Sequence, residues 1–419
     1  MTSVPLPDSL SPETTGLSPR QVGLILFALT LGGFAIGTGE FASMGLMPNM
    51  VASLGVTEPQ VGHLISAYAL GVVVGAPLLA ILGAGWKRKT LLLSLMGFYA
   101  LGNLASALGP SYGSLLLFRF IAGLPHGAYF GVAALTAVAI SPPDRRGRAV
   151  SLVMLGLTLA ILIGNPLATW AGQVIDWRWI YAAVAVVAVT TVVLLAVWLP
   201  AHVDGAKTKP LDELRAFNRL PVWQALGIGA IGFAGMFAVF SYLAPTMLEV
   251  TGVSAAWIPL GLAGFGLGGV IGNFAGGWLY DHYKLRGAWV VLVWAIAALL
   301  LFPLMAQSLP TILLATVAIG LMGALGPILQ SHLMDVAGDA QTLAAASHHA
   351  AFNTANALGP WLGGMAITAG FGWTSTGYVG AATAVVGLMI YVWASRTLQS
   401  NALAKAVIGT DRVAACEAG

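Results

Sequence analysis

Charged residues are scarce in this chain: they make up 8% of its 419 residues, whereas 58% are hydrophobic. A soluble domain carries about 25% charged residues, so this chain lacks the charge needed to cover itself with a water-compatible surface. We therefore expect lipid to be its main solvent, as in an integral membrane protein. The net charge of +3 would favour nucleic-acid binding in a soluble chain, but here the basic residues lie in short loops between apolar runs, so we expect no nucleic acid.

Cysteine and enzyme motifs are also missing. The single cysteine, Cys416, excludes a disulfide framework and a thiolate metal site. The sequence contains no Walker loop, no His-Glu-x-x-His and no nucleophile elbow, and its apolar runs hold no paired nucleophile and base or paired carboxylates. We therefore expect no enzyme activity, no metal and no cofactor.

Long apolar runs, in contrast, are abundant. A helix needs about 20 mostly apolar residues to cross the hydrocarbon core. Twelve such runs occur, at about 21–47, 61–83, 90–109, 114–140, 148–172, 178–199, 222–246, 257–280, 288–308, 311–334, 343–370 and 375–394. The longest polar stretch separates the first six from the last six.

These runs predict an all-α polytopic membrane protein built from two six-helix bundles. Its predicted parts are a disordered cytoplasmic tail at 1–20, an N-terminal bundle at 21–199, a cytoplasmic linker at 200–221, a C-terminal bundle at 222–394 and a cytoplasmic tail at 395–419. The first twenty residues lack the basic segment of a signal peptide.

The positions of lysine and arginine predict the orientation. Of the 18 basic residues, all but Arg119 and Arg178 fall in the two tails or in alternate loops on one side. Because cytoplasmic loops carry the excess of basic residues, we expect both termini in the cytoplasm and the protein in the cell (inner) membrane.

The two halves also match each other at a shift of about 197 residues. Glycines and prolines recur in corresponding spans: Pro48 with Pro245, Gly55 with Gly252, Gly71 with Gly268, Gly75 with Gly272, and Gly123 with Gly320. Such repeats are typical of transporters, and two halves of equal orientation are expected to face each other across a central cavity.

Ionisable residues inside spans are the strongest functional candidates, because burying them costs several kcal/mol. Glu40 lies in the extracytoplasmic third of the first span, and the second half has Phe237 at the matching position. Arg119 lies roughly 8 Å deep in the fourth span, at a comparable depth. A carboxylate in a low-dielectric site can load and release a proton near neutral pH. The two residues could therefore pair and handle protons, although Glu40 could also be a structural residue bonded to backbone.

Further polar side chains form stripes on two spans. His126 lies on the same helix face as Arg119, and His349, Asn353 and Asn356 share a face of the eleventh span. With Tyr242 as a weaker candidate, these side chains are predicted to bind the substrate. The alternatives are a packing histidine at position 126 and interhelical contacts in the eleventh span.

The eighth span carries Gly264, Gly268, Gly272 and Gly276 at i+4 spacing. This ridge of small residues is interpreted as a surface for close helix packing.

Together these features resemble those of the major facilitator superfamily, and within it the twelve-span drug:proton antiporters of the arabinose-efflux-permease-like branch. The resemblance covers about residues 20–395. Its most specific segments are Gly39-Glu40-Phe41 before Pro48, Ser66 through Gly71 with Gly75-Ala76-Pro77, Arg119 through Ala128, Gly164-Asn165-Pro166, and Trp177-Arg178-Trp179.

The resemblance implies roles for several residues. The family's fourth-span arginine, matched by Arg119, is associated with proton coupling, and Glu40 fits the acidic partner in the first span. The family's gating aspartate after the second span is replaced by Ala84, while Lys87 and Arg88 remain; the second-half copy keeps Asp281. The Gly-Pro-x-x-Gly-Gly string of antiporters stands here in the eleventh span, at 359–364, rather than in the fifth.

The predicted function is a secondary transporter that exports a small organic solute, such as a drug or sugar, by proton antiport and alternating access. Its expected partners are that solute, protons and the lipid bilayer, and we expect a monomer. Proton-coupled uptake of a sugar or nucleoside is the alternative within the same class. A channel or membrane receptor is the alternative from another class. The sequence does not identify the solute.

Overall fold

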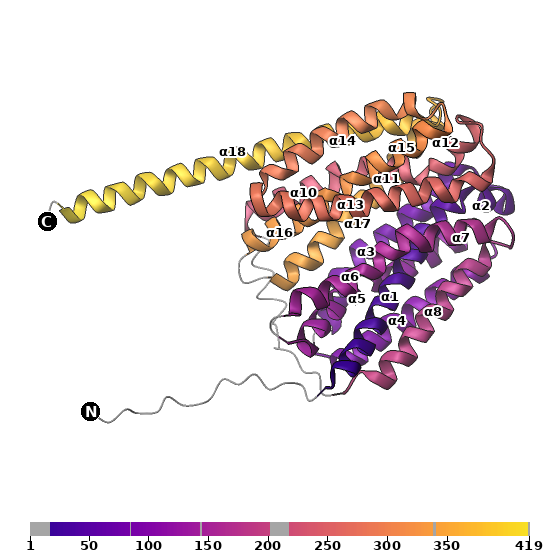
Figure 1. Cartoon of the computed structure of the whole chain (residues 1–419), viewed down its shortest axis with the longest axis horizontal. Helices are drawn as coiled ribbons and strands as arrows, with labels where there is room; N and C mark the ends of the chain where they lie inside the picture. The colour runs from indigo at the N-terminus through magenta and orange to yellow at the C-terminus, as the bar shows by residue number, and fades with distance from the viewer. Residues whose placement is uncertain (1–16, 84, 143–144, 202–217, 338–340, 418–419) are drawn as a thin grey trace.

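The computed structural model describes residues 17–83, 85–142, 145–201, 218–337 and 341–417. Most of the predicted N-terminal tail, most of the predicted linker and Ala84 fall outside these ranges. Within them the chain is helical, and long helices run side by side through the molecule (Figure 1). The N-terminal half and the C-terminal half form two adjacent bundles, as the apolar runs predict.

The N-terminal bundle has six crossings. They are α1 (Pro19–Gly45), α3 (Glu58–Gly83), α4 (Arg88–Leu108), α5 (Tyr112–Ile140), the continuous segment of α6 (Arg146–Leu159), η2 (Ala160–Gly164) and α7 (Asn165–Gly172), and α8 (Arg178–Trp198). A short helix, α2 (Met47–Leu54), joins α1 to α3.

The C-terminal bundle repeats this order. Its crossings are α10 (Leu220–Gly232) with α11 (Ala234–Ser241), η4 (Ala255–Trp257) with α13 (Ile258–Tyr283), α14 (Arg286–Met305), α15 (Leu309–Gly320) with η5 (Leu321–Ala324) and α16 (Leu325–Ala337), α17 (Gln341–Thr368), and α18 (Ser375–Glu417). The short α12 (Leu243–Glu249) occupies the place of α2. The spans are where the sequence predicts them, except that α18 continues well beyond residue 394.

Eleven of these crossings are, within the described residues, both long and apolar enough to traverse a membrane. The twelfth, α17, has the required length of 28 residues but carries His348, His349, Asn353 and Asn356 near its middle. It packs against α3 of the other bundle and against α10 and α11 of its own, so it lies inside the assembly. The position of α17 between the halves explains why it can carry these polar side chains.

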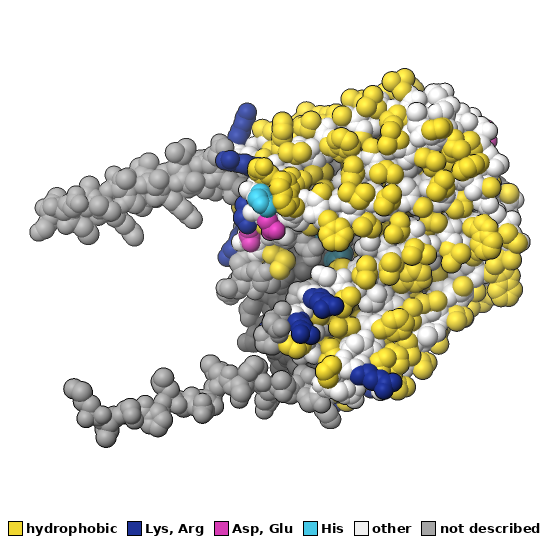
Figure 2. Space-filling model, viewed as in Figure 1, with side chains coloured by type: hydrophobic (Ala, Val, Ile, Leu, Met, Phe, Trp, Pro, Cys, Tyr) yellow, Lys and Arg dark blue, Asp and Glu magenta, His cyan; other side chains and the backbone are white. Residues whose placement is uncertain are grey.

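The outer surface of the helices is hydrophobic, as a lipid-facing surface must be. Side chains such as Phe274, Leu304 and Val197 are exposed, and yellow apolar atoms cover the flank of the molecule in Figure 2. Lysine and arginine atoms gather at the end from which α1 begins and α18 leaves. We call this end the terminal face and the opposite end, where α2 and α12 lie, the distal face.

The predicted duplication is confirmed by equivalent backbone conformations. Pro48 and Pro245 each follow a break in the helix, at Leu46 and at Tyr242, because proline cannot donate the hydrogen bond that would continue it. The matched glycines Gly55 and Gly252 both have positive φ, at 65° and 70°, which glycine adopts without strain.

Equivalent glycines also bring equivalent helices together. A Cβ atom at Gly71 would lie 2.1 Å from the carbonyl oxygen of Phe120, and one at Gly268 would lie 2.2 Å from that of Val317. These pairs, α3 with α5 and α13 with α15, correspond at the 197-residue shift. The whole ridge on α13 faces α15, η5 and α16 in this way, which confirms its interpretation as a packing surface.

The two bundles meet mainly toward the distal face. Ser66 Oγ donates to the carbonyl of Ala357 at 2.8 Å, and Gln173 Nε2 donates to the carbonyl of Ala255 at 2.8 Å. Toward the terminal face the two bundles diverge in the ribbon view (Figure 1), and the space-filling view is hollowed between them (Figure 2). The described residues of the two bundles are therefore in contact toward the distal face and lie farther apart toward the terminal face.

Candidate functional site

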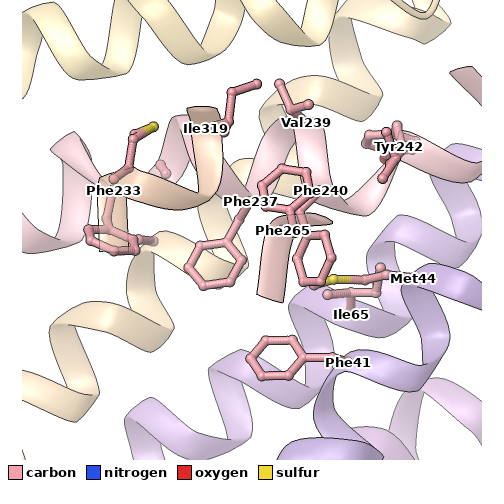
Figure 3. Packing of buried hydrophobic residues seen from close by; sticks show 14 of the residues in the cluster. Phe41, Met44, Ile65, Phe233, Phe237, Val239, Phe240, Tyr242, Phe265 and Ile319 are labelled. Atoms are coloured by element: carbon pink, nitrogen blue, oxygen red, sulfur yellow. The ribbon is translucent and has the colours of Figure 1, made fainter. Parts of the chain in front are cut away.

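An aromatic layer joins the two halves in the interior. Phe41 of α1 stacks on Phe237 of α11, with ring centroids 6.4 Å apart, and lies 5.9 Å from Phe240. Figure 3 shows these rings together with Met44, Ile65 and Phe265, all turned toward one another from the two bundles. Because these side chains are almost fully buried, the layer closes the molecule between the interior and the distal face.

Glu40 lies next to this layer and is almost fully buried, with 1% of its surface exposed. The glycines on either side of Thr38 allow neighbouring helices to approach α1 closely. A Cβ at Gly37 would lie 2.6 Å from that of Ala160, and one at Gly39 would lie 2.2 Å from the Tyr99 hydroxyl. The local sequence therefore holds a carboxylate on a tightly packed part of α1, where the two bundles meet.

The partner of this carboxylate comes from the other half of the molecule. The Asn356 side-chain amide of α17 donates to Glu40 Oε1 at 2.7 Å, and Asn356 is fully buried. The second carboxylate oxygen, Oε2, lies 3.8 Å from Nδ1 of His126, which is beyond hydrogen-bonding distance. Glu40 is thus held between a histidine of its own bundle and an amide of the opposite bundle.

Arg119 contacts the backbone around Glu40 rather than the Glu40 carboxylate. Its Nη2 donates to the carbonyl of Gly39 at 2.8 Å and lies 3.5 Å from that of Glu40. The guanidinium carbon lies 4.4 Å from the ring centre of Tyr68 and 5.0 Å from that of Tyr181. The cation is therefore sandwiched between two aromatic faces, which stabilises it away from water.

His126 connects this region to a row of rings that leads toward the terminal face. Its Nδ1 is hydrogen-bonded to the Tyr68 hydroxyl at 3.1 Å, and its ring centre lies 5.3 Å from that of Phe130. Phe130 in turn stacks on His349 of α17, 5.6 Å away and nearly parallel. His349 and the adjacent His348 are only partly buried, so the row runs from the hollow between the halves to Glu40.

A small pocket, with room for about one water molecule, lies beside this row in the C-terminal bundle. It is lined by α10, α16 and α17, largely by apolar side chains that include Phe233 and Phe352, with His348 as its polar member. In this conformation the pocket is too small to hold a solute group.

The remaining predicted binding residues lie in two different places. Asn353 is buried one turn from Asn356, but its amide donates to the carbonyl of His349 in its own helix at 3.0 Å. Tyr242 lies at the distal end of α11, away from the row of rings, and its hydroxyl donates to the carbonyl of Pro360 at 2.8 Å. It also packs against Gly62 of α3, so it belongs to the distal contact between the halves.

The predicted gating residues lie at the terminal face. Lys87 is exposed and precedes α4, while Arg88 donates to the carbonyl of Leu135 at 3.2 Å within the same bundle. The Asp281 side chain is exposed at the end of α13. The neighbouring Tyr280 hydroxyl donates to Asp335 of α16, a contact that the sequence did not indicate.

Several polar atoms around Glu40 are buried without a hydrogen-bond partner among the described residues. They are Oε2 of Glu40, Nε and Nη1 of Arg119, and the side-chain oxygens of Asn103, Asn353 and Asn356. Buried polar groups are normally paired, so these atoms can bind a polar solute or water. The sequence patterns did not single out Tyr99, Asn103 or Tyr181 as site residues. The i+4 spacing of Tyr99 and Asn103, which places them on one helix face, was the available signal.

Comparison with known proteins decides the family. The profile of the Major Facilitator Superfamily matches residues 29–293 and 260–414. The chain belongs to the Major Facilitator Superfamily. Members of this superfamily are transporters, so the expectation of a transporter rather than an enzyme is confirmed, and its two six-helix bundles are the fold seen here.

Its relatives in the superfamily include both general transport proteins and a resistance protein. The inner membrane transport protein YdhP of Escherichia coli is 36% identical over 90% of this chain and 97% of its own length. The putative transporter AraJ of Escherichia coli is 34% identical over 83% and 88%. The chloramphenicol resistance protein of Streptomyces lividans is 34% identical over 80% and 87%.

The fold is also that of a solved superfamily member. A bacterial homologue of the human lysosomal transporter Spinster, crystallised in an inward-facing and unoccupied conformation, superimposes with a TM-score of 0.72. The match covers 92% of this chain and 99% of the other, at 18% identity. At that identity the similarity supports the shared fold of the superfamily.

Proposed function

We propose that this superfamily member exports a small organic solute in exchange for protons, with Glu40 as the residue that carries the proton. The observation that supports this most is the position of Glu40, a buried carboxylate in contact with both halves. Ionisable groups inside a membrane are costly and characteristically mark proton or substrate pathways. A resistance protein among the relatives favours export over uptake.

The orientation completes this proposal. Basic residues gather at the terminal face (Figure 2), so we place that face in the cytoplasm by the positive-inside rule. The side on which the described parts of the two bundles lie farther apart would then face the cytoplasm and open to it, as in an inward-facing conformation. A solute to be exported would enter this open side first.

Roles for the other residues follow from their positions. Arg119, with its charge kept between Tyr68 and Tyr181, would hold the backbone around Glu40 and balance its charge when it is ionised. His126, His349, Asn353 and Asn356 would contact the solute on the way to Glu40.

Tyr242 and the residues of the terminal face would then act on opening and closing. Tyr242 would stabilise the distal contact while the terminal face is open. Asp281, Lys87 and Arg88 lie where the open face must close in the other half of the cycle, and we propose them as closing contacts.

Accumulation measurements test the direction and the solute class together. Cells with and without the protein are exposed to a panel of antibiotics, including chloramphenicol, and of sugars. Lower accumulation of a compound in cells that contain the protein supports export, whereas higher accumulation means uptake and contradicts the proposal.

The role of Glu40 is tested with the compound found in this way. In inside-out vesicles, Glu40→Gln should reduce transport driven by a proton gradient by about 10²-fold or more, because an amide cannot exchange protons. Full proton-driven transport by Glu40→Gln would show that another group carries the proton.

A further inference from the structure

The hydrogen bond between Asn356 and Glu40 joins the two moving halves of the protein at the proposed proton site. We infer that Asn356 is a positioning residue: it holds the distal face closed while Glu40 is ionised and no solute is bound. This inference rests on the proposed role of Glu40. It adds a partner from the C-terminal half to a proton site that lies in the N-terminal half.

The geometry of the bond suits this role. Donor and acceptor are 316 residues apart in sequence and 2.7 Å apart in space, and both side chains are almost fully buried. The next residue of α17, Ala357, accepts a hydrogen bond from Ser66 of α3. Two successive residues of α17 are therefore attached to the opposite bundle, so the distal contact cannot open there without breaking these bonds.

The helix around Asn356 is also suited to move. Pro360 follows Asn356 by four residues inside α17, and proline has no backbone N–H to donate to the Asn356 carbonyl. Helices bend preferentially at such positions. A change at the Asn356 side chain can therefore be transmitted to the direction of the distal end of α17.

The charge of Glu40 sets the strength of the bond. A hydrogen bond to an ionised acceptor is roughly twice as strong as a bond between neutral groups. Protonation of Glu40 therefore weakens the contact and favours separation of the halves. The titratable and charged groups that contact Glu40, its helix or its neighbours, and that could respond to the same proton, are Tyr68 of α3, Tyr99 of α4, Arg119 and His126 of α5, Tyr181 of α8 and His349 of α17.

This arrangement explains how transport of the solute can be strictly coupled to transport of a proton in the opposite direction. A solute that hydrogen-bonds to Glu40 or Asn356 replaces one partner, and a proton on Glu40 weakens the acceptor; either event releases the distal contact. The empty carrier with ionised Glu40 keeps the full contact and stays closed. An antiporter needs this rule, because opening of the empty ionised form would let the solute and the proton move independently.

The test measures the distal opening directly and needs no solute. Thr57 and Ser254 are exposed on the two halves at the distal face and correspond at the repeat shift. In a chain with Cys416→Ser, spin labels at Thr57→Cys and Ser254→Cys report the distance between the halves by pulsed electron paramagnetic resonance. We expect one short distance in alkaline buffer, and a longer-distance population that grows about fivefold in acidic buffer.

Two variants of Asn356 test the inference. Asn356→Ala should show the longer distance in both buffers. Asn356→Asp should invert the response, because two ionised carboxylates repel in alkaline buffer while a shared proton joins them in acidic buffer. Thr354→Ala is the matched control: Thr354 lies on the same helix but bonds to its own backbone, at the carbonyl of Ala350, so the normal response should remain.

The outcomes separate this inference from the proposed function. If Glu40→Gln removes the response to pH but Asn356→Ala and Asn356→Asp behave like the parent, Glu40 titrates and the inference about Asn356 is wrong. If Glu40→Gln keeps the response while the Asn356 variants change it, Asn356 holds the distal contact through another titrating group, and the proposed role of Glu40 is wrong. A parent with no response to pH contradicts both.

Discussion

Replacing Gly268 by alanine should destabilise the protein, because this glycine allows two helix backbones to touch. A Cβ at this position would lie 2.2 Å from the carbonyl oxygen of Val317 and 2.9 Å from the Cα of Gly320. Ordinary contacts begin at about 3.4 Å, so α13 and α15 would have to separate by about 1 Å, and a gap of that size forfeits up to about half of each neighbouring van der Waals contact. Forced packing of this kind costs about 1–3 kcal/mol.

The matched control is Gly277→Ala in the same helix. A Cβ at Gly277 would have no other atom within 4 Å. Both substitutions gain the same helix propensity, about 1 kcal/mol, so the difference between the two variants isolates the cost of the clash. In the N-terminal half, Gly71→Ala and Gly97→Ala form the corresponding pair.

The assay is the free energy of unfolding, measured by SDS titration in mixed micelles. Gly268→Ala should be about 1–3 kcal/mol less stable than Gly277→Ala, and Gly71→Ala should differ from Gly97→Ala by a similar amount. Equal stabilities within about 0.5 kcal/mol in both pairs would refute the close packing that relates the two halves.

Two further substitutions test individual contacts. Arg119→Lys keeps the charge but loses the flat guanidinium between Tyr68 and Tyr181. The free energy of unfolding should therefore fall by about 1–3 kcal/mol. An unchanged free energy of unfolding would contradict the packing of Arg119 between the two rings. Tyr280→Phe removes the hydroxyl that donates to Asp335 between α13 and α16, and it should lower the free energy of unfolding by about 1 kcal/mol. In a double-mutant cycle, the same substitution in an Asp335→Asn background should lower it by less. An equal loss in both backgrounds would contradict the contact.

The architecture could be predicted because it depends on sequence features with local meaning. Apolar runs of sufficient length predict the spans, and the glycine and proline matches predict the duplication, since each marks a backbone contact or a helix break. Gly55 and Gly252, with the same positive φ, show how directly such residues report the backbone. The length of α18 was not predicted, because the chain after residue 394 has no apolar pattern that marks its end.

The candidate site was predictable only in part. The cost of burying charge singled out Glu40 and Arg119, and depth placed them near each other. The sequence could not show that Arg119 binds the backbone of α1, or that Glu40 is paired with Asn356. Which helix faces meet across the two halves depends on how each helix is rotated, and the spacing within one helix does not contain that information.

The central claim is that a solute displaces a proton from Glu40, and proton release on binding tests it most directly. The purified protein, in weakly buffered detergent solution acidic enough for Glu40 to carry its proton, is mixed with a compound identified by the accumulation measurements. A pH-sensitive dye reports the proton released. The account predicts release of about one proton per protein from the parent and none from Glu40→Gln, which lacks the titrating group. Equal proton release from both proteins would contradict it.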